Sequence, residues 1–443
     1  MTINISAPHK KLAMAVMTLA CGMAYAQDNS LDPRSLAMGG TGVTTSNAGN
    51  ADFHNPAMLA SVKTSNEENF AIALPILGFR LQDEKDLQND VSDLQKNGDA
   101  LSSSANAFRS ALNSYNSVQN PTNLSNLQAA AGSASSALNR FNNSILLIND
   151  KAVSANGLAG LMIAIPSKSS AVSLFADARL EMGARFNYAT ADQALVTGLS
   201  NNLTTCSSGT IANCNNAGSN FDSSGQVTGL QSKLIVRGAV VGEIGLAIAR
   251  HFDSLGGVDI GIAPKMTKFS TVDFAEGAQD HPELTLDQGK KDYSSFNVDL
   301  GVAKTFSLAD GDDIKVGVAA RDILSRSFVT VLGNNIEVKP KVTFGASYLT
   351  KLTTLGLDID LVPNKPMVVG LIKESQFVRV GAEFDAWSWA QIRMGYRHDV
   401  KGNYAGLPSI GLGLSPFGIH LDLSVASAGK KEVAVSLQAG FRF

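Results

Sequence analysis

Apolar and polar residues alternate with a period of two along most of the chain beyond residue 171. In residues 172–188 every even position is apolar, whereas the odd positions include both acidic and basic side chains. This alternation is typical of β-strands with one apolar and one polar face. With two earlier segments included, we expect strands near residues 68–81, 153–166, 171–188, 233–250, 258–274, 294–308, 314–323, 337–350, 354–362, 376–386, 390–400, 409–416, 419–426 and 431–443.

The length and charge of these strands favour a membrane barrel over a soluble β-sandwich, whose strands also alternate. Several exceed the 5–6 residues usual in soluble strands, and their polar faces hold many Arg, Asp and Glu residues but few Lys. Charges of both signs can pair across neighbouring strands on a lumen wall. We therefore predict an all-β transmembrane barrel of about fourteen antiparallel strands. In-strand glycines, which ease bends and close backbone approach, are Gly183, Gly238, Gly245, Gly301, Gly345, Gly395, Gly411 and Gly413.

The connections give an independent test, because outer-membrane barrels alternate short periplasmic turns with longer outer loops. Short connections fall at residues 167–170, 251–257, 309–312, 351–353, 387–389 and 417–418. Longer ones fall at residues 82–152, 189–232, 275–293, 324–336, 363–375 and 401–408. Only the last connection, residues 427–430, departs from this order. The alternation supports the barrel and places the longer connections on the extracellular side.

In the connection between the first two strands, the spacing of the apolar residues changes from the period of two seen in the strands. Apolar residues there follow the three-and-four spacing of a helix, in runs over residues 87–115 and 124–148. Asn120-Pro121 separates the runs, and asparagine is a favourable N-cap while proline suits the first helical position. We predict an antiparallel helical hairpin over residues 86–148, which is either a self-packed loop excursion or a device that contacts another molecule.

The N-terminus has the features of a secretory signal peptide. Two lysines precede an apolar run at residues 12–20, and Ala24-Tyr25-Ala26 places small residues where a signal peptidase reads them. We expect cleavage after Ala26, with lipidation of Cys21 as the alternative. Beyond this segment no apolar run reaches 18 residues, so no transmembrane helix is expected.

Two cysteines, Cys206 and Cys214, remain after cleavage, in a run rich in Asn, Ser, Thr and Gly. Exported proteins favour disulfides, and no histidine or further cysteine lies nearby to complete a zinc site. We therefore predict a Cys206–Cys214 disulfide that stiffens an exposed loop.

Composition narrows the function classes. The chain has 443 residues, of which 17% are charged and 44% hydrophobic, with a formal net charge of −3. A nucleic-acid binder would carry a strong positive excess, and a disordered chain would be less apolar and more charged. The mean hydropathy of +0.05 is too low for a polytopic helical membrane protein but ordinary for a barrel, in which apolar residues alternate.

No motif indicates catalysis or a cofactor. Gly39-Gly40-Thr41-Gly42 lacks the Gly-Lys-Ser/Thr of a P-loop, and neither HExxH nor GxSxG occurs. His54 and His420 are the histidines expected inside the barrel, in structural roles. We expect no enzymatic activity, no metal and no cofactor.

The segment before the first strand has the features of a compact plug. Gly39, Gly40 and Gly42 permit tight turns, and Asn55-Pro56 favours a turn or an extended link. The stretches 32–43 and 53–59 resemble the N-terminal hatch of FadL-like outer-membrane barrels, and more closely the outer-membrane family of conjugal transfer protein TraF. The C-terminal third is similar as well, through the segments 393–397 (RMGYR), 411–418 (GLGLSPFG) and 440–443 (GFRF).

The resemblance implies a fourteen-stranded barrel whose hatch plugs the lumen, in a group that takes up fatty acids or aromatic compounds. It divides the chain into a signal peptide (1–26), a hatch (27–66) and a barrel (67–443) that contains the helical insertion (86–148). Relatives usually carry acidic residues where this chain has none, over residues 44–51. The residues that the resemblance assigns to the hatch and its gating are Arg34, Gly39, Gly40, Gly42, Asn55, Pro56 and Ala57.

Two functions are open. One is a hatch-gated channel for hydrophobic or amphipathic small molecules. The apolar hatch residues would then line a ligand pocket, or else form the core of the hatch; they are Leu36, Met38, Phe53, Met58 and Leu59. The other is an outer-membrane interaction or assembly protein of a conjugation or secretion apparatus.

Both functions place the protein in the outer membrane of a Gram-negative cell. The expected partners are outer-membrane lipid and the barrel-assembly machinery. The C-terminal end of the chain, with Phe441 and Phe443, resembles the signal that this machinery reads. A hydrophobic small molecule or a conjugation-apparatus protein is the third expected partner, and no nucleic acid is expected.

Overall fold

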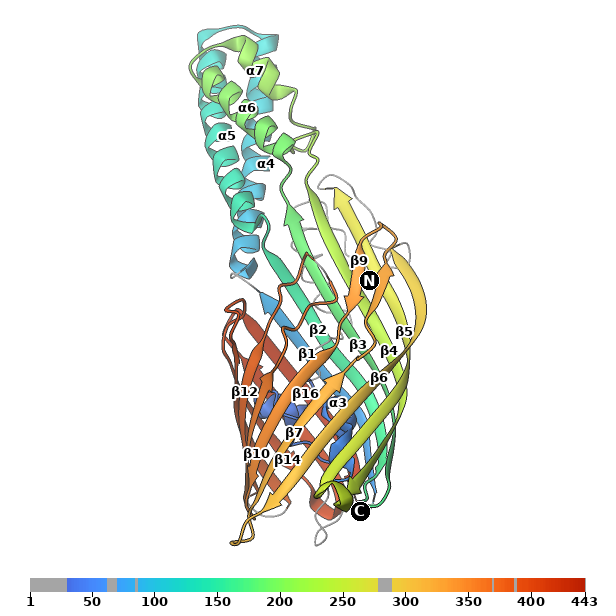
Figure 1. Cartoon of the computed structure of the whole chain (residues 1–443). Coiled ribbons are helices and arrows are strands. Elements are labelled where there is room, and N and C mark those ends of the chain that lie inside the picture. Colours follow the sequence, from blue (N-terminus) through green and yellow to red (C-terminus); the bar gives the residue numbers. More distant parts are fainter. Residues whose placement is uncertain are drawn as a thin grey trace.

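The computed structural model describes residues 30–61, 70–83, 87–277, 289–368, 370–385 and 389–442. The predicted signal peptide and Phe443 lie outside these residues. Figure 1 shows a tall barrel with a helical bundle standing on one end. The chain ends at the opposite end of the barrel.

Fourteen antiparallel strands close the barrel, which confirms the predicted fold class. Every strand pairs with its neighbour along the ring, and β1 pairs with β16 to close it. The predicted strand bounds differ from the observed ones by at most four residues. The strands are β1 Ala71–Asp83, β2 Ala152–Ile165, β3 Ala171–Asn187, β4 Lys233–Phe252, β5 Val258–Gly277, β6 Lys290–Ser307, β7 Asp313–Arg321, β10 Lys341–Leu349, β11 Thr353–Asp360, β12 Phe377–Asp385, β13 Ala390–Asp399, β14 Leu407–Leu414, β15 Ile419–Ser427 and β16 Glu432–Arg442.

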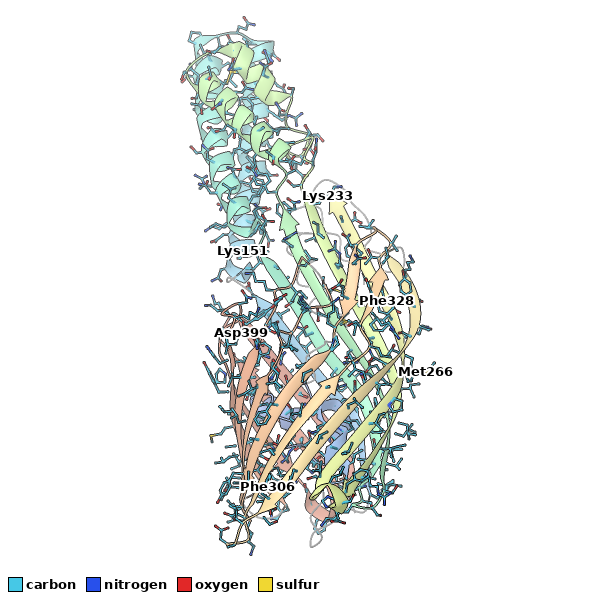
Figure 2. The ribbon with its side chains drawn as sticks, in the orientation of Figure 1. Lys151, Lys233, Met266, Phe306, Phe328 and Asp399 are labelled. Atoms are coloured by element: carbon cyan, nitrogen blue, oxygen red, sulfur yellow. A yellow bond between two sulfur atoms is a disulfide. The ribbon has the colours of Figure 1, made fainter. Side chains whose placement is uncertain are left out.

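The alternation of the sequence separates two environments. In β3, Leu174 points outward and is 50% exposed, whereas Asp177, Arg179 and Glu181 point inward and are buried. The other strands follow the same rule, and Met266 and Phe306 are outward side chains that can be followed in Figure 2. Exposed apolar side chains on the outer wall include Ile244, Leu246, Ile248, Ile262, Phe296, Ile392, Met394, Ile410, Leu412, Leu423, Val433 and Val435.

The predicted helical hairpin is confirmed. It consists of α4 (Leu87–Ser117) and α5 (Pro121–Ile148). The Asn120 side chain caps α5 by accepting a hydrogen bond from the backbone N–H of Asn123 at 2.7 Å. Within the described part of the chain, no helix is both long and apolar enough to cross a membrane.

Residues 189–232 were predicted to be a long loop, but the structure shows two helices there. These are α6 (Thr190–Ser207) and α7 (Ile211–Gly218), which pack on the hairpin as a four-helix bundle (Figure 1). Cys206 of α6 and Cys214 of α7 are joined by a disulfide and are fully buried. The expectation of an exposed loop at these cysteines is therefore wrong, because the disulfide lies in the core shared by the helices.

The N-terminal residues 30–61, which we call the hatch, lie inside the lower half of the barrel (Figure 1). They form three short helices, α2 (Pro33–Ala37), α3 (Ala51–His54) and the 3₁₀-helix η1 (Pro56–Leu59). Almost every residue of the hatch is buried. Two further 3₁₀-helices, η2 (Asp253–Leu255) and η3 (Pro416–Gly418), form short turns at the same end of the barrel.

Two segments that were expected to be loops narrow the opposite mouth of the barrel. One is the small hairpin of β8 (Arg326–Val329) and β9 (Asn335–Val338), which is separate from the barrel sheet. The ring of Phe328 stacks on that of Phe269 of the wall, with centroids 4.2 Å apart. The other segment lies between β11 and β12 and is described over residues 361–368 and 370–376.

Candidate functional site

The hatch is anchored to the barrel wall by charged and polar contacts. The guanidinium of Arg34 pairs with the carboxylate of Glu383 at 2.6 Å. The carboxylate of Asp358 accepts hydrogen bonds from the backbone N–H groups of Gly42 and Val43, at 2.8 and 3.0 Å. Such contacts to a charged group contribute roughly 1.5–3 kcal/mol each when buried. The predicted hatch residues Arg34 and Gly42 therefore lie at the points that fix the hatch in place.

The hatch also has an internal polar centre at Asp32. This side chain caps α2 by accepting from the backbone N–H of Ser35 at 3.1 Å. It also accepts from the amide of Asn50 at 2.8 Å and lies 2.5 Å from Nε2 of His54. One carboxylate thus ties the first helix to Asn50 and His54 at the two ends of α3, and His54 has a structural contact inside the barrel.

The motif Asn55-Pro56-Ala57 forms the last turn of the hatch. The side-chain oxygen of Asn55 accepts from the backbone N–H of Ala57 at 3.0 Å, which caps η1. Its amide nitrogen donates to the backbone carbonyl of Val43 at 2.9 Å. Asn55 therefore joins the two halves of the hatch, and Pro56 occupies the first position of η1, where a missing N–H costs no hydrogen bond.

Glycines of the wall make room for the hatch backbone. A Cβ atom at Gly395 would lie 2.0 Å from the backbone nitrogen of Gly39, and one at Gly301 would lie 1.9 Å from the side-chain oxygen of Asn55. No side chain fits at such distances. Further wall glycines in close contact with the hatch are Gly78, Gly261, Gly345, Gly381 and Gly411.

Three glycines of the hatch itself also exclude a side chain, for reasons that differ between them. Gly39 and Gly40 adopt φ angles of +70° and +93°, which side chains rarely tolerate. Gly42 has an ordinary φ, but a Cβ there would lie 2.3 Å from the ring of His54. The tight path of the hatch therefore depends on all three positions.

The apolar residues that we considered as ligand-lining are buried against the wall or within the hatch. Leu36 and Phe53 belong to a cluster with residues of β1, β2 and β14, and Met58 and Leu59 belong to one with residues of β2 to β6. Met38 lies against Gly381 of β12. Phe53 also borders a void of about 370 Å³ that His54 and Arg321 share, part of it open to solvent.

The wall around the hatch carries buried ion pairs across neighbouring strands. The ammonium of Lys265 lies 2.7 to 3.2 Å from the carboxylates of Glu243, Asp299 and Asp322. Arg321 of the same group pairs with Asp299 at 3.3 Å and also donates to the backbone carbonyl of Phe53 in the hatch. The charged strand faces of the sequence are thus neutralised in the lumen by partners on adjacent strands.

A second chain of polar contacts includes His420. Its Nδ1 contacts the hydroxyl of Ser415 and its Nε2 contacts the carboxylate of Asp422, which also pairs with Arg393. In serine hydrolases the serine lies on Nε2 and the acid on Nδ1, the reverse of this order. Among the described residues, no group of three or more His, Cys, Asp or Glu side chains could hold a metal ion.

Residues 361–368 and 370–376 form a lid across the mouth. The backbone N–H of Val368 donates to the carboxylate of Glu181 in β3 at 3.1 Å, and the carbonyl of Met367 accepts from Glu337 of β9 at 3.1 Å. In the ring of fourteen strands, β3 lies seven places from β12, which the lid enters. The lid therefore reaches the opposite wall. The sequence indicated only a long connection here.

A chamber lies between the lid and the hatch. It contains about 620 Å³ of space that protein atoms do not fill, part of it open to solvent. Arg80 lines it and also donates to the hydroxyl of Ser30 in the hatch at 3.3 Å. Lys341 lines both the chamber and the void beside Phe53. The chamber thus extends from the lid toward the hatch, and its lysines were not among the residues singled out in the sequence.

Phe441 lies on the outer face of β16, opposite Ile72 and Ile419 of the neighbouring strands, and is 45% exposed. This orientation is the one that the C-terminal alternation predicts. Phe443 lies outside the described residues.

The sequence profile of one family, described as the F plasmid transfer operon TraF protein, matches residues 52–360. The chain belongs to this family. The match begins in α3 of the hatch and ends with β11, so it covers the bundle and most of the barrel. No curated protein matches the sequence of this chain significantly.

Two solved structures of toluene transporters are similar to nearly the whole chain. The toluene transporter TbuX of Ralstonia pickettii is 12% identical, with a TM-score of 0.49, over 94% of this chain and 99% of that chain. The toluene transporter TodX of P. putida is 9% identical, with a TM-score of 0.45, over 93% of this chain and 98% of that chain.

Proposed function

We propose that this TraF-family protein is an outer-membrane channel that passes small amphipathic or hydrophobic molecules when its hatch moves. The observation that carries the proposal is a closed barrel whose lumen is blocked by one separate segment, residues 30–61, below a solvent-connected chamber. A barrel that served only as an anchor would need neither feature.

The outer wall supports the membrane location. Outward side chains along the strands are apolar and exposed, for example Ile244 at 63%, Met266 at 64% and Ile410 at 62%. Large contiguous apolar surfaces on a protein mark a site of contact with lipid or with another protein. Because the apolar side chains surround a closed barrel with polar residues inside, lipid is the natural surrounding.

The contacts of the hatch suit a movable plug. Its charged anchors are hydrogen bonds and ion pairs, such as those of Arg34 and Asp358, which water or a ligand can replace one at a time. The hatch comes before β1 in the sequence and is not a strand of the barrel. It can therefore shift without breaking the pairing between any two neighbouring strands. Movement of this segment would join the chamber to the far side of the barrel.

Permeation measured in proteoliposomes tests the channel. In the double variant Arg34→Ala/Asp358→Ala, the hatch loses two of its charged wall anchors, and we expect at least a several-fold rise in the flux of small solutes. The control is Arg185→Ala, which removes a long ion pair to Asp150 above the hatch. An unchanged flux, although protease cuts the loosened hatch, would contradict gating by this segment.

A second candidate function is that of an interaction protein, as the name of the family suggests. The observation that favours it is the four-helix bundle, which stands clear of the barrel on the side of the lid (Figure 1). Both of its excursions leave the ring at paired residues, Asp83 opposite Val153 and Asn187 opposite Lys233. Such ends can be joined by a short turn without disturbing the barrel.

Removal of the bundle therefore separates the two functions. Residues 84–152 and 188–232 are each replaced by Asn-Gly, a two-residue turn that suits antiparallel strands. The channel hypothesis predicts that solute flux survives, whereas the interaction hypothesis predicts that partner binding or mating is lost. Deletion of residues 86–148 alone is the wrong test, because α6 and α7 would lose the core that they share with α4 and α5.

A further inference from the structure

The part of the wall beside α3 of the hatch holds more buried acids than buried bases. Ion pairs connect three bases, Arg179, Lys265 and Arg321, with four acids. The acids are Asp177, Glu243, Asp299 and Asp322, and all seven side chains are buried. Each base in this network therefore has a carboxylate partner within it, and the acids are in excess by one before the hatch adds its own.

Asp52 of the hatch adds a further buried carboxyl group beside this network. Its side chain is 1% exposed. The hydroxyl of Ser173 in β3 donates to its Oδ2, whereas its Oδ1 accepts no hydrogen bond from the described residues. The charged groups that face Asp52 are Arg321 of β7 and Asp299 of β6. Because Arg321 also pairs with Asp299 and donates to the carbonyl of Phe53, its charge is shared among several acceptors.

These surroundings favour the neutral form of Asp52. A carboxylate that leaves water without a full set of hydrogen bonds loses more solvation than the neutral acid does. Burial raises the pKa of Asp52 to about 7, although the Ser173 hydroxyl and the Arg321 guanidinium favour the charged form. When the hatch leaves the wall, the carboxyl group meets water, and its pKa returns toward the ordinary value of about 3.9.

We infer that a proton on Asp52 holds the hatch against the wall, and that loss of this proton favours release of the hatch. The direction follows from the two pKa values of Asp52, about 3.9 when released and about 7 when buried. Between them the released hatch binds fewer protons than the held one, so a rise in pH shifts the equilibrium toward release. The consequence, a channel that is more open at neutral than at acidic pH, rests on the proposed function.

Hydrogen exchange of the hatch amides in the purified full-length protein tests the inference between about pH 5 and pH 8. Rates are divided by those of unstructured peptide at the same pH, which removes the chemical pH dependence of exchange. We expect protection of the wild-type hatch to fall about tenfold or more over this range, while the barrel strands stay protected. In Asp52→Asn the side chain is neutral at every pH, and the fall should be less than about twofold.

A second variant acts on the same carboxyl group without removing it. Ser173→Ala removes a hydroxyl that favours the charged form, so the fall in protection should extend to higher pH than in the wild type. The matched control is Asp222→Asn, which neutralises a carboxylate of the bundle region that accepts from the backbone of Ser224 and Gln226. Its hatch should follow the wild-type pH profile.

Three results would overturn the inference: wild-type protection that does not change with pH, a fall in Asp52→Asn as large as in the wild type, which would assign the response to another group such as His54, or an unshifted profile in Ser173→Ala. Heat-modifiable gel migration checks that each variant keeps its barrel. Because exchange is measured without flux, a pH-dependent hatch with no permeation would refute the channel alone. Permeation that rises in Arg34→Ala/Asp358→Ala while protection stays independent of pH would refute the role of Asp52 alone.

Discussion

The hatch and the helical bundle are both assembled from distant parts of the sequence, but different interactions hold them. The hatch meets the wall through glycine gaps, backbone hydrogen bonds and ion pairs, with apolar contacts between them. The bundle has a continuous apolar core and a buried disulfide. Between Arg109 and Arg140, and again between Asp192 and Asp222, it has no charged residue at all.

The difference shows how each part can behave. Apolar cores are close-packed and respond to lost volume, so the bundle is expected to be a rigid unit. Polar contacts lose less on separation because water replaces them, so the hatch is expected to leave its seat more easily. The four predictions below test this contrast, beginning with the largest effect.

Phe108→Ala should unfold the bundle and leave the barrel intact. Phe108 is fully buried in the shared core, with its ring 6.4 Å from that of Phe221. Loss of a buried phenylalanine costs about 3–5 kcal/mol. Limited proteolysis should cut α4 to α7 in the variant, while heat-modifiable migration of the barrel is retained. Loss of the barrel along with the bundle would show that the two regions are not independent.

Removal of the disulfide should weaken the bundle to a smaller extent. Cys206 and Cys214 are eight positions apart, and closure of so short a loop contributes roughly 2.5 kcal/mol in the chain-entropy description. In Cys206→Ser/Cys214→Ser, we expect the helices of the bundle to unfold at a lower denaturant concentration than in the wild type. The rate of proteolysis measures this unfolding. Solute flux should be unaffected, and a change in flux would link the bundle to the hatch.

Gly395→Ala should displace the hatch and spare the bundle. The new Cβ would overlap the backbone of Gly39, which cannot move as a flexible side chain would. Overpacking of this kind costs about 1–3 kcal/mol. Protease sensitivity of the hatch and solute flux should both rise. The matched control is Gly242→Ala, whose Cβ would lie 3.9 Å from its nearest neighbour; equal effects at the two glycines would contradict the argument.

Asp358→Asn should give the smallest change, a loosening of the hatch by about 1 kcal/mol. The amide keeps the shape of the acceptor but not its charge toward the N–H groups of Gly42 and Val43. A comparable aspartate in the bundle region is Asp222, which accepts from the backbone of Ser224 and Gln226 at 2.8 and 2.9 Å. Asp222→Asn should leave the hatch unchanged. Hydrogen exchange of the hatch amides measures the difference.

Much of the fold could be read from local pattern. Period-two alternation located the strands and their outward faces, and the helical spacing located α4 and α5 with Asn120 as the cap. Helices α6 and α7 were not predicted, because Asn, Ser, Thr and Gly are weak helix formers. Their helical state is stabilised by packing against α4 and α5, which adjacent residues in the sequence do not encode.

The candidate site was predictable in part. The turn chemistry of Gly39, Gly40 and Asn55 indicated a compact plug, but not which wall residues receive it. Nothing local connects Arg34 with Glu383, which is 349 positions away. The lysines of the lid were likewise unremarkable in the sequence, because a charged residue in a long connection is ordinarily solvated.

By itself, the sequence determined which residues form strands and which side of each strand faces outward, because a strand exposes alternate residues to opposite faces. Tertiary structure decided where the hatch sits, how the lid crosses to β3 and which cations share the chamber. Those features depend on ring closure, which brings opposite walls and distant loops within a few ångströms of one another, and no local pattern of residues specifies such distances.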